Sequence, residues 1–212
     1  LEAQRLLRRA LKHLLLALGP IVAILIPLAP DILRLLFGAE YAARGTLVLQ
    51  VLAVGVLVNC LAFLPVAMTQ AAGRPDLSAR FHLIEMPIHV ALVWLLVGRW
   101  GINGAALAWS ARVALDAVLQ FGGAVRLGTL PRRFLTQDRL PQAVALLVLL
   151  GMLAWLLAAV VAPQWLRLTS LALLLLSAAG TGWRYLLDGA EREQLTRLLR
   201  PAVAVRSPEV GT

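Results

Sequence analysis

The sequence of 212 residues contains one cysteine, Cys60. A single cysteine excludes an internal disulfide framework and a zinc site built from several thiolates. A free cysteine behaves as a small apolar residue, so we expect Cys60 to be a buried packing residue.

Charged residues are also scarce. They make up 15% of the sequence, whereas hydrophobic residues make up 60% and the mean hydropathy is +0.82. Soluble domains contain about 25% charged and about 45–50% apolar residues, so this composition is typical of an integral membrane protein. The net charge of +9 does not indicate a nucleic-acid partner, because the basic residues lie between apolar runs rather than in a patch among aromatic residues.

An initiating methionine and a secretory cleavage site are both missing. The sequence begins at Leu1, which indicates a fragment or a processed product. The first apolar run follows basic residues, as in a signal peptide, but it lacks a small-residue cleavage site and many similar runs follow it. We therefore expect this run to be a membrane span.

Apolar runs long enough to cross a membrane follow one another along the chain. A spanning helix needs about 20 mainly apolar residues, and about six segments meet or approach this length. The expected spans are 12–30, 45–70, 79–97, 102–125, 141–162 and 166–187. The sequence therefore predicts an all-α membrane protein whose helical bundle occupies residues 1–188.

Prolines and glycines divide the bundle. Three prolines in the first span predict a kink and an end near Pro30, followed by a short interfacial helix over 31–37. Asp76 is placed to cap the helix that follows the second span. Turns are predicted at 38–41, 73–76 and 98–102.

The part of the chain after the bundle has a different character. Residues 189–200 carry leucines at helical spacing among charges, which predicts an amphipathic helix on the membrane surface. Residues 201–212 are expected to be disordered. With six spans, most of the 20 lysines and arginines fall on the side of the two termini. Because cytoplasmic loops are enriched in these residues, both termini are expected in the cytoplasm.

Five ionisable residues lie inside two consecutive spans. His82, Glu85 and His89 share one face of the first of these helices, and Arg112 and Asp116 share one face of the second. A charged group at membrane depth costs roughly 2.5–3.5 kcal/mol, so such groups face a bundle interior or a wet cavity.

The depths of these residues predict contacts between the two helices. Counted from the turn at Gly101, Glu85 lies opposite Asp116, and His89 lies opposite Arg112. Arg112 is therefore within reach of Asp116 on its own helix and of Glu85 or His89 across the turn.

Two interpretations of this polar group remain open. In the first, Arg112 is neutralised by Asp116 and Glu85, and the ion pairs lock the two helices together. In the second, the group binds an anionic head group or relays protons, which requires that desolvation keeps a proton on one carboxylate. Two carboxylates against one arginine leave no spare positive charge for an anion, which favours the first interpretation.

The remaining polar and small residues predict helix packing. The small-residue run 104–108 suits a close helix contact, and four uncharged side chains are expected to form hydrogen bonds between helices: Gln50, Asn59, Gln70 and Gln120. No phosphate loop, nucleophile triad or zinc-ligand spacing stands out, and His82, Glu85 and His89 are weak evidence for a metal. We therefore expect no catalytic residue, no cofactor and no metal.

A family resemblance rests on two long stretches. Residues 70–87 read QAAGRPDLSARFHLIEMP, and residues 101–116 read GINGAALAWSARVALD. Together they resemble consecutive helices of O-antigen (Wzx-type) oligosaccharide flippases, which belong to the multidrug/oligosaccharidyl-lipid/polysaccharide exporter superfamily. The resemblance covers about residues 11–125, whereas the last two spans match only as generic terminal helices.

The resemblance implies a two-lobed transporter that moves lipid-linked oligosaccharide repeat units, carried on a polyprenyl diphosphate, across the bacterial inner membrane by alternating access. This chain would be the C-terminal part of such a protein. Its partners would be the lipid bilayer, the lipid-linked substrate and the missing N-terminal lobe. The candidate substrate or coupling residues are Arg112, Asp116, Glu85, His89 and Arg74.

Other functions stay open at this point. A related exporter of drugs or of another lipid-linked precursor fits the same helices. A membrane-embedded glycosyl- or acyltransferase needs a carboxylate or a histidine in a loop at the membrane surface, and the expected outer loops offer only Asp31 and Glu40. A purely structural membrane subunit is the remaining alternative.

Overall fold

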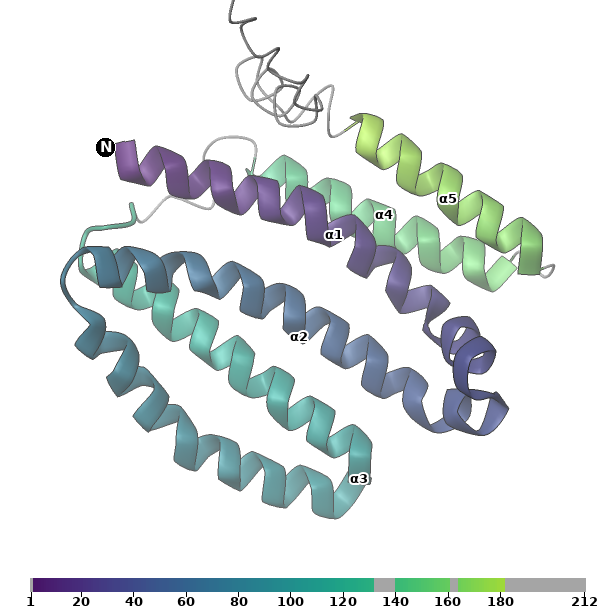
Figure 1. The fold of residues 1–212 in the computed structure, drawn as a ribbon, viewed down its shortest axis with the longest axis horizontal. Coiled ribbons are helices and arrows are strands. Elements are labelled where there is room, and N and C mark those ends of the chain that lie inside the picture. Colours follow the sequence, from purple (N-terminus) through teal and green to yellow (C-terminus); the bar gives the residue numbers. More distant parts are fainter. Residues whose placement is uncertain (1, 132–139, 161–163, 182–212) are drawn as a thin grey trace, which may run out of the picture.

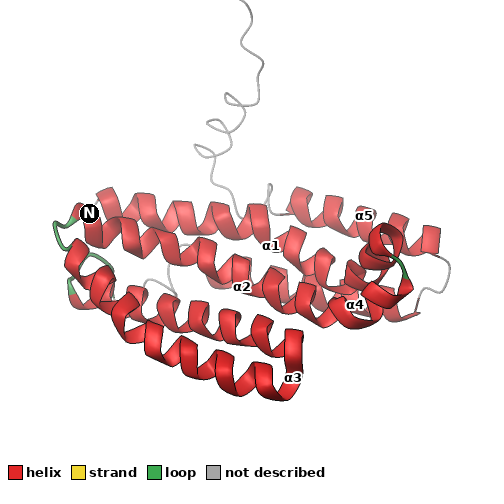
Figure 2. Cartoon of the chain, turned by 60° about the horizontal axis from the view of Figure 1, so that its bottom comes forward, coloured by secondary structure: helices red, strands yellow, loops and turns green. Residues whose placement is uncertain are grey.

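A computed structural model of the chain describes residues 2–131, 140–160 and 164–181. Within these ranges the chain forms helices joined by short turns, and no strand is present (Figures 1 and 2). The helices are α1 (Glu2–Phe37), α2 (Ala39–Ala71), α3 (Pro75–Arg126), α4 (Leu140–Val160) and α5 (Gln164–Thr181). The predicted surface helix over 189–200, the tail over 201–212 and the end of the sixth span lie outside the described residues.

The helices are arranged around α1. One side of α1 packs against α2, which in turn packs against α3, and α4 packs against α1 with α5 beside it (Figure 1). Four helices are long and apolar enough to cross a membrane, and the corresponding segments are Arg9–Phe37, Ala39–Ala71, Pro75–Arg126 and Pro141–Ala158. The prediction of an all-α membrane protein is therefore confirmed. The number of six crossings stays a prediction, because α5 is not among these four helices.

Helix α3 is a hairpin rather than one straight helix. Its backbone leaves the helical conformation at Gly101, which has φ 54° and ψ −129°, and the second arm returns along the first (Figure 1). Glycine adopts positive φ without the steric penalty of a Cβ atom. The predicted turn over 98–102 is therefore confirmed, and each arm has about 25 residues, enough for a crossing.

Helix α1 continues through Pro30 to Phe37, so the predicted end near Pro30 and the separate interfacial helix over 31–37 are wrong. Proline has no N–H and leaves the carbonyl four residues earlier without its helical partner. For Pro30 this carbonyl belongs to Ile26, and the Gln50 side chain of α2 donates a hydrogen bond to it at 2.9 Å. The neighbouring helix therefore satisfies the carbonyl and allows the helix to continue.

Replacing Gln50 by leucine is expected to destabilise the protein by about 1 kcal/mol, because the Ile26 carbonyl loses its donor where no water replaces it. Unfolding in detergent micelles of increasing dodecyl sulfate content measures the change. Pro30→Ala provides the control, since an alanine N–H at position 30 can donate to the same carbonyl. Gln50→Leu should therefore have a smaller effect in the Pro30→Ala background, and an equal effect would contradict this account.

Small residues set the distances between α2 and the two arms of α3. The side chains of Trp109 and Ser110 cover Gly55, where a Cβ atom would lie 2.6 Å from the Trp109 ring. Gly104, Ala106 and Ala108 are buried in the second arm of α3, which confirms the close packing predicted for 104–108. Cys60 is only half-buried on α2, so its predicted full burial is wrong.

Candidate polar site in the α3 hairpin

The two arms of α3 bring four of the ionisable residues together. Arg112 Nη1 donates to Glu85 Oε2 at 3.5 Å across the hairpin. His82 Nδ1 lies 3.5 Å from Glu85 Oε2 and 3.8 Å from Asp116 Oδ1. The prediction that these residues meet between antiparallel helices is therefore confirmed.

The predicted pair of Arg112 with Glu85 is confirmed, but the two arms are paired about one helical turn away from the predicted level. Counting from Gly101 places Glu85 opposite Asp116, whereas in the structure Glu85 faces Arg112 and His82 faces Asp116. The first arm remains helical through Trp100, so the midpoint of the pairing lies near Arg99. The expected ion pair between Arg112 and Asp116 is not among the contacts of the described residues.

Asp116 is held by a chain of polar side chains instead. Gln120 Nε2 donates to Asp116 Oδ1 at 3.1 Å, and Ser78 Oγ donates to Gln120 Oε1 at 3.1 Å. Thr69 Oγ1 of α2 lies 3.5 Å from Ser78 Oγ and donates to the Val66 carbonyl at 2.8 Å. The hydrogen-bonding role predicted for Gln120 is confirmed, as is that of Gln50.

Thr69 and Ser78 were missed by the sequence analysis. Both side chains are buried, and Ser78 lies as far from Arg99 on the first arm as Gln120 lies on the second. This equal distance from Arg99 along two antiparallel arms is the signal in the sequence that could have placed Ser78 opposite Gln120. Asn59 and Gln70 were predicted to bond between helices, but neither side chain has such a bond in the part of the chain that the structure describes.

His89 does not join the cluster. It is half-buried one helical turn beyond Glu85, and its Nδ1 atom is buried without a hydrogen-bond partner. Of the two partners predicted for Arg112 across the turn, Glu85 pairs with it and His89 does not, because of the shifted pairing of the arms. In the described part of the chain, His89 therefore forms no ion pair with the other candidate residues.

Burial differs strongly within the cluster. The Glu85 side chain is 1% exposed, whereas those of Arg112 and His82 are 30% and 55% exposed. The second Glu85 oxygen, Oε1, is buried without a hydrogen-bond partner. Glu85 and Asp116 against Arg112 leave one net negative charge when His82 is neutral. Within the described residues, Glu85 is thus buried, whereas Arg112 and His82 are partly exposed.

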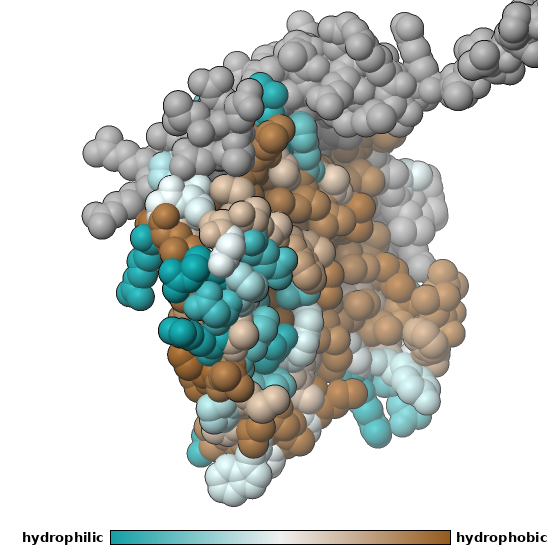
Figure 3. Space-filling view, turned by 60° about the vertical axis from the view of Figure 1, so that its left-hand side comes forward, coloured by the Kyte–Doolittle hydropathy of each residue, from teal (hydrophilic) through white to brown (hydrophobic). Residues whose placement is uncertain are grey.

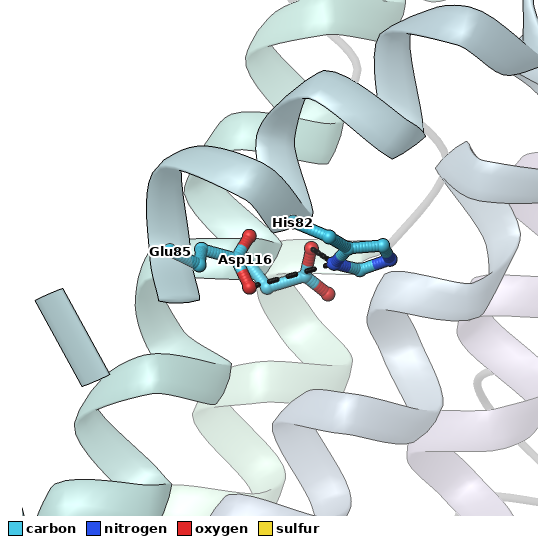
Figure 4. A group of neighbouring side chains, drawn as sticks. All are labelled: His82, Glu85 and Asp116. Atoms are coloured by element: carbon cyan, nitrogen blue, oxygen red, sulfur yellow. Dashed lines mark ion pairs between the residues drawn. The ribbon is translucent and has the colours of Figure 1, made fainter. Parts of the chain in front are cut away.

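Three of these side chains converge from the two arms. One atom each of His82, Glu85 and Asp116 lies within 4.8 Å of the others (Figure 4). In the sequence, His82 and Glu85 were weak evidence for a metal together with His89, but the structure places Asp116 beside them instead. An imidazole nitrogen and two carboxylate oxygens are donors that divalent metal ions accept.

Arg74 lies away from this cluster, in the turn between α2 and α3. Its Nε donates to Asp76 Oδ1 at 3.1 Å, and this hydrogen bond, with the negative charge of Asp76, raises the pKa of Arg74. Arg80 Nη2 also lies 3.7 Å from Asp76 Oδ2. Figure 3 views the molecule from the side of this turn, where hydrophilic residues gather beside a hydrophobic flank.

The predicted cap of α3 by Asp76 is wrong. Arg74 occupies the N-cap position, Pro75 follows it, and no side chain makes a capping hydrogen bond there. Asp76 lies in the first turn of the helix, where its charge interacts favourably with the helix dipole. Arg74 therefore lies in the turn between α2 and α3, and its charge is paired with that of Asp76.

Fold and site together define a multi-pass helical membrane protein with a partly buried cluster of ionisable side chains in a helical hairpin. Comparison with known proteins shows a sequence similarity to a transporter. The chain is similar to the "Putative O-antigen transporter" of Shigella flexneri, with 33% identity over 118 residues, which are 56% of this chain and 28% of that protein. This similarity confirms the resemblance to O-antigen flippases. No family model matches the chain, and no solved structure matches it.

Proposed function

We propose that this chain forms part of a transporter that moves lipid-linked oligosaccharide repeat units, carried on a polyprenyl diphosphate, across the bacterial inner membrane by alternating access. The observation that carries the proposal is the 33% identity to an O-antigen transporter over 118 residues. Since the chain spans 28% of the length of that relative, further helices would complete the transport path. Such a transporter would serve the synthesis of surface polysaccharide. Both termini of the chain would lie in the cytoplasm.

The polar cluster supports a place for the α3 hairpin beside that path. Arg112 and His82 are partly uncovered by the described helices, although they lie inside a segment apolar enough to cross a membrane. Ionisable groups at such depth face a bundle interior or a water-filled cavity rather than lipid. We therefore propose that the uncovered side of the cluster faces the transport cavity and that the ion pair of Arg112 with Glu85 holds the hairpin in shape.

Deleting the gene that encodes the chain tests the transport function. The expected result is loss of the surface polysaccharide together with accumulation of the lipid-linked repeat unit inside the cell, because the saccharide is made but not moved. Extraction and chromatography of the polyprenyl-linked saccharides, together with electrophoresis of the surface polysaccharide, measure both effects. Complementation with the intact gene should restore both to wild-type levels.

The same strain separates the alternatives. A membrane-embedded glycosyltransferase would abolish the complete repeat unit instead of accumulating it. A drug exporter would leave the polysaccharide unchanged and raise sensitivity to the drugs it exports. Either result would contradict the proposed function.

A further inference from the structure

We propose that His82, Glu85 and Asp116 form a binding site for a first-row divalent metal ion, with Zn²⁺ as the best fit. Metal binding at this site is not part of the proposed transport function. Its test measures the binding of the ion directly and does not depend on transport. It joins the two arms of the α3 hairpin, since His82 and Glu85 belong to the first arm and Asp116 to the second (Figure 4).

The distances fit a metal with three protein ligands. Ligand atoms about 2.0–2.2 Å from a tetrahedral zinc ion lie roughly 3.3–3.6 Å from one another. Here His82 Nδ1 lies 3.5 Å from Glu85 Oε2 and 3.8 Å from Asp116 Oδ1, and the three ligand atoms are within 4.8 Å of one another. Small side-chain rotations therefore bring all three atoms to coordinating distance.

An independent observation at Glu85 points to a missing ligand. Its side chain is 1% exposed, yet Oε1 is buried without a hydrogen-bond partner, and the side chain points toward His82 and Asp116 (Figure 4). A buried carboxylate oxygen without a partner loses the solvation that water would provide. The 3.5 Å distance to His82 is measured to Oε2, which Arg112 also contacts, whereas Oε1 of the same carboxylate has no partner. Rotation of the carboxylate about its last bond would present Oε1 to the cation.

The donor set and the charge select the kind of cation. An imidazole nitrogen suits zinc and its neighbours, whereas calcium and magnesium prefer oxygen ligands alone. A divalent ion would change the net charge of the cluster from one negative to one positive with Arg112 included. The Gln120 side chain, which donates to Asp116, would orient that ligand from outside the site.

The half-exposed position of His82 keeps one side of the site accessible. Three protein ligands and an open fourth position are the arrangement of zinc sites that bind water or an exchangeable ligand. A bound ion would also tie the two arms of α3 together by coordination bonds.

The test is titration of the chelator-treated full chain, purified in detergent, with Zn²⁺ in a calorimeter. We expect about one ion per chain, and binding at least about 10-fold weaker in H82A and in D116N. His82→Ala is the more informative variant, since a half-exposed side chain is removed with little loss of packing. H13A and H89A are the matched controls and should bind as the unchanged chain does.

Cobalt titration separates loss of the site from loss of the fold. Co²⁺ in a tetrahedral site absorbs visible light, so the unchanged chain and H89A should develop this absorption and H82A should not. Thermal unfolding of the metal-free H82A protein should match that of the unchanged chain. Absence of Zn²⁺ binding in the unchanged chain, or equal binding in H82A, would overturn the proposal.

Discussion

Replacing Gly104 by alanine is expected to destabilise the protein by about 3 kcal/mol, at the upper end of the usual effect of overpacking. A Cβ atom at this position would overlap the backbone carbonyl of Leu96 on the facing arm and would lie 2.8 Å from Val97 N. Backbone atoms cannot rotate away as a side chain can, so the two arms of α3 would have to separate. Thermal unfolding of the purified protein, followed by size-exclusion chromatography, measures the effect.

Gly122→Ala is the matched control for this substitution. It lies in the same arm of α3, and a Cβ atom there would meet no atom within 4 Å. Alanine stabilises a helix relative to glycine by about 1 kcal/mol, so G122A should be neutral or slightly stabilising. Equal unfolding temperatures for G104A and G122A would show that the arms do not approach as closely as the structure indicates.

Removing Arg112 is expected to have an effect of similar size. Arg112→Ala leaves the buried Glu85 carboxylate without its cationic partner, which costs about 3–5 kcal/mol when both groups of a pair are buried. Arg112 is 30% exposed, so we expect a loss nearer to about 2–3 kcal/mol. Unfolding in mixed micelles of increasing dodecyl sulfate content gives this difference.

A second substitution identifies the partner of Arg112. Glu85→Gln in the Arg112→Ala background should recover most of the stability, because it removes the unpaired charge. Asp116→Asn in the same background should recover little, since Asp116 contacts His82 and Gln120 rather than Arg112. Equal recovery by both substitutions would mean that net charge matters and the particular pair does not.

Much of the fold could be predicted because it depends on local properties of the chain. The apolar run that became α2 and the glycine turn that became the bend at Gly101 are visible without any neighbour. The effect of Pro30 could not be predicted in the same way. Whether a helix ends at a proline depends on a donor for the freed carbonyl, and here Gln50 on another helix supplies it.

The candidate site shows the same division. Helical periodicity predicted that Glu85 and Asp116 lie on facing sides of two neighbouring helices. It also allowed the pair of Arg112 with Glu85, which the structure contains. It did not predict that Asp116 approaches His82 rather than Arg112, since this depends on how far the first arm continues into the turn. A shift of one helical turn gives Asp116 the neighbour His82 and leaves His89 without Arg112.

The sequence by itself determined that this protein lies in a membrane, because its content of 60% hydrophobic residues and its scarcity of charged residues are properties of composition. It also determined which residues are too polar for lipid, since the free energy of placing a charge at membrane depth belongs to each side chain. Only the tertiary structure decided how those side chains are paired and which of them converge as a possible metal site. The physical reason is that ion pairs and coordination require contacts of 2–4 Å, and such distances are set by the packing of Gly104 and its neighbours rather than by spacing along one helix.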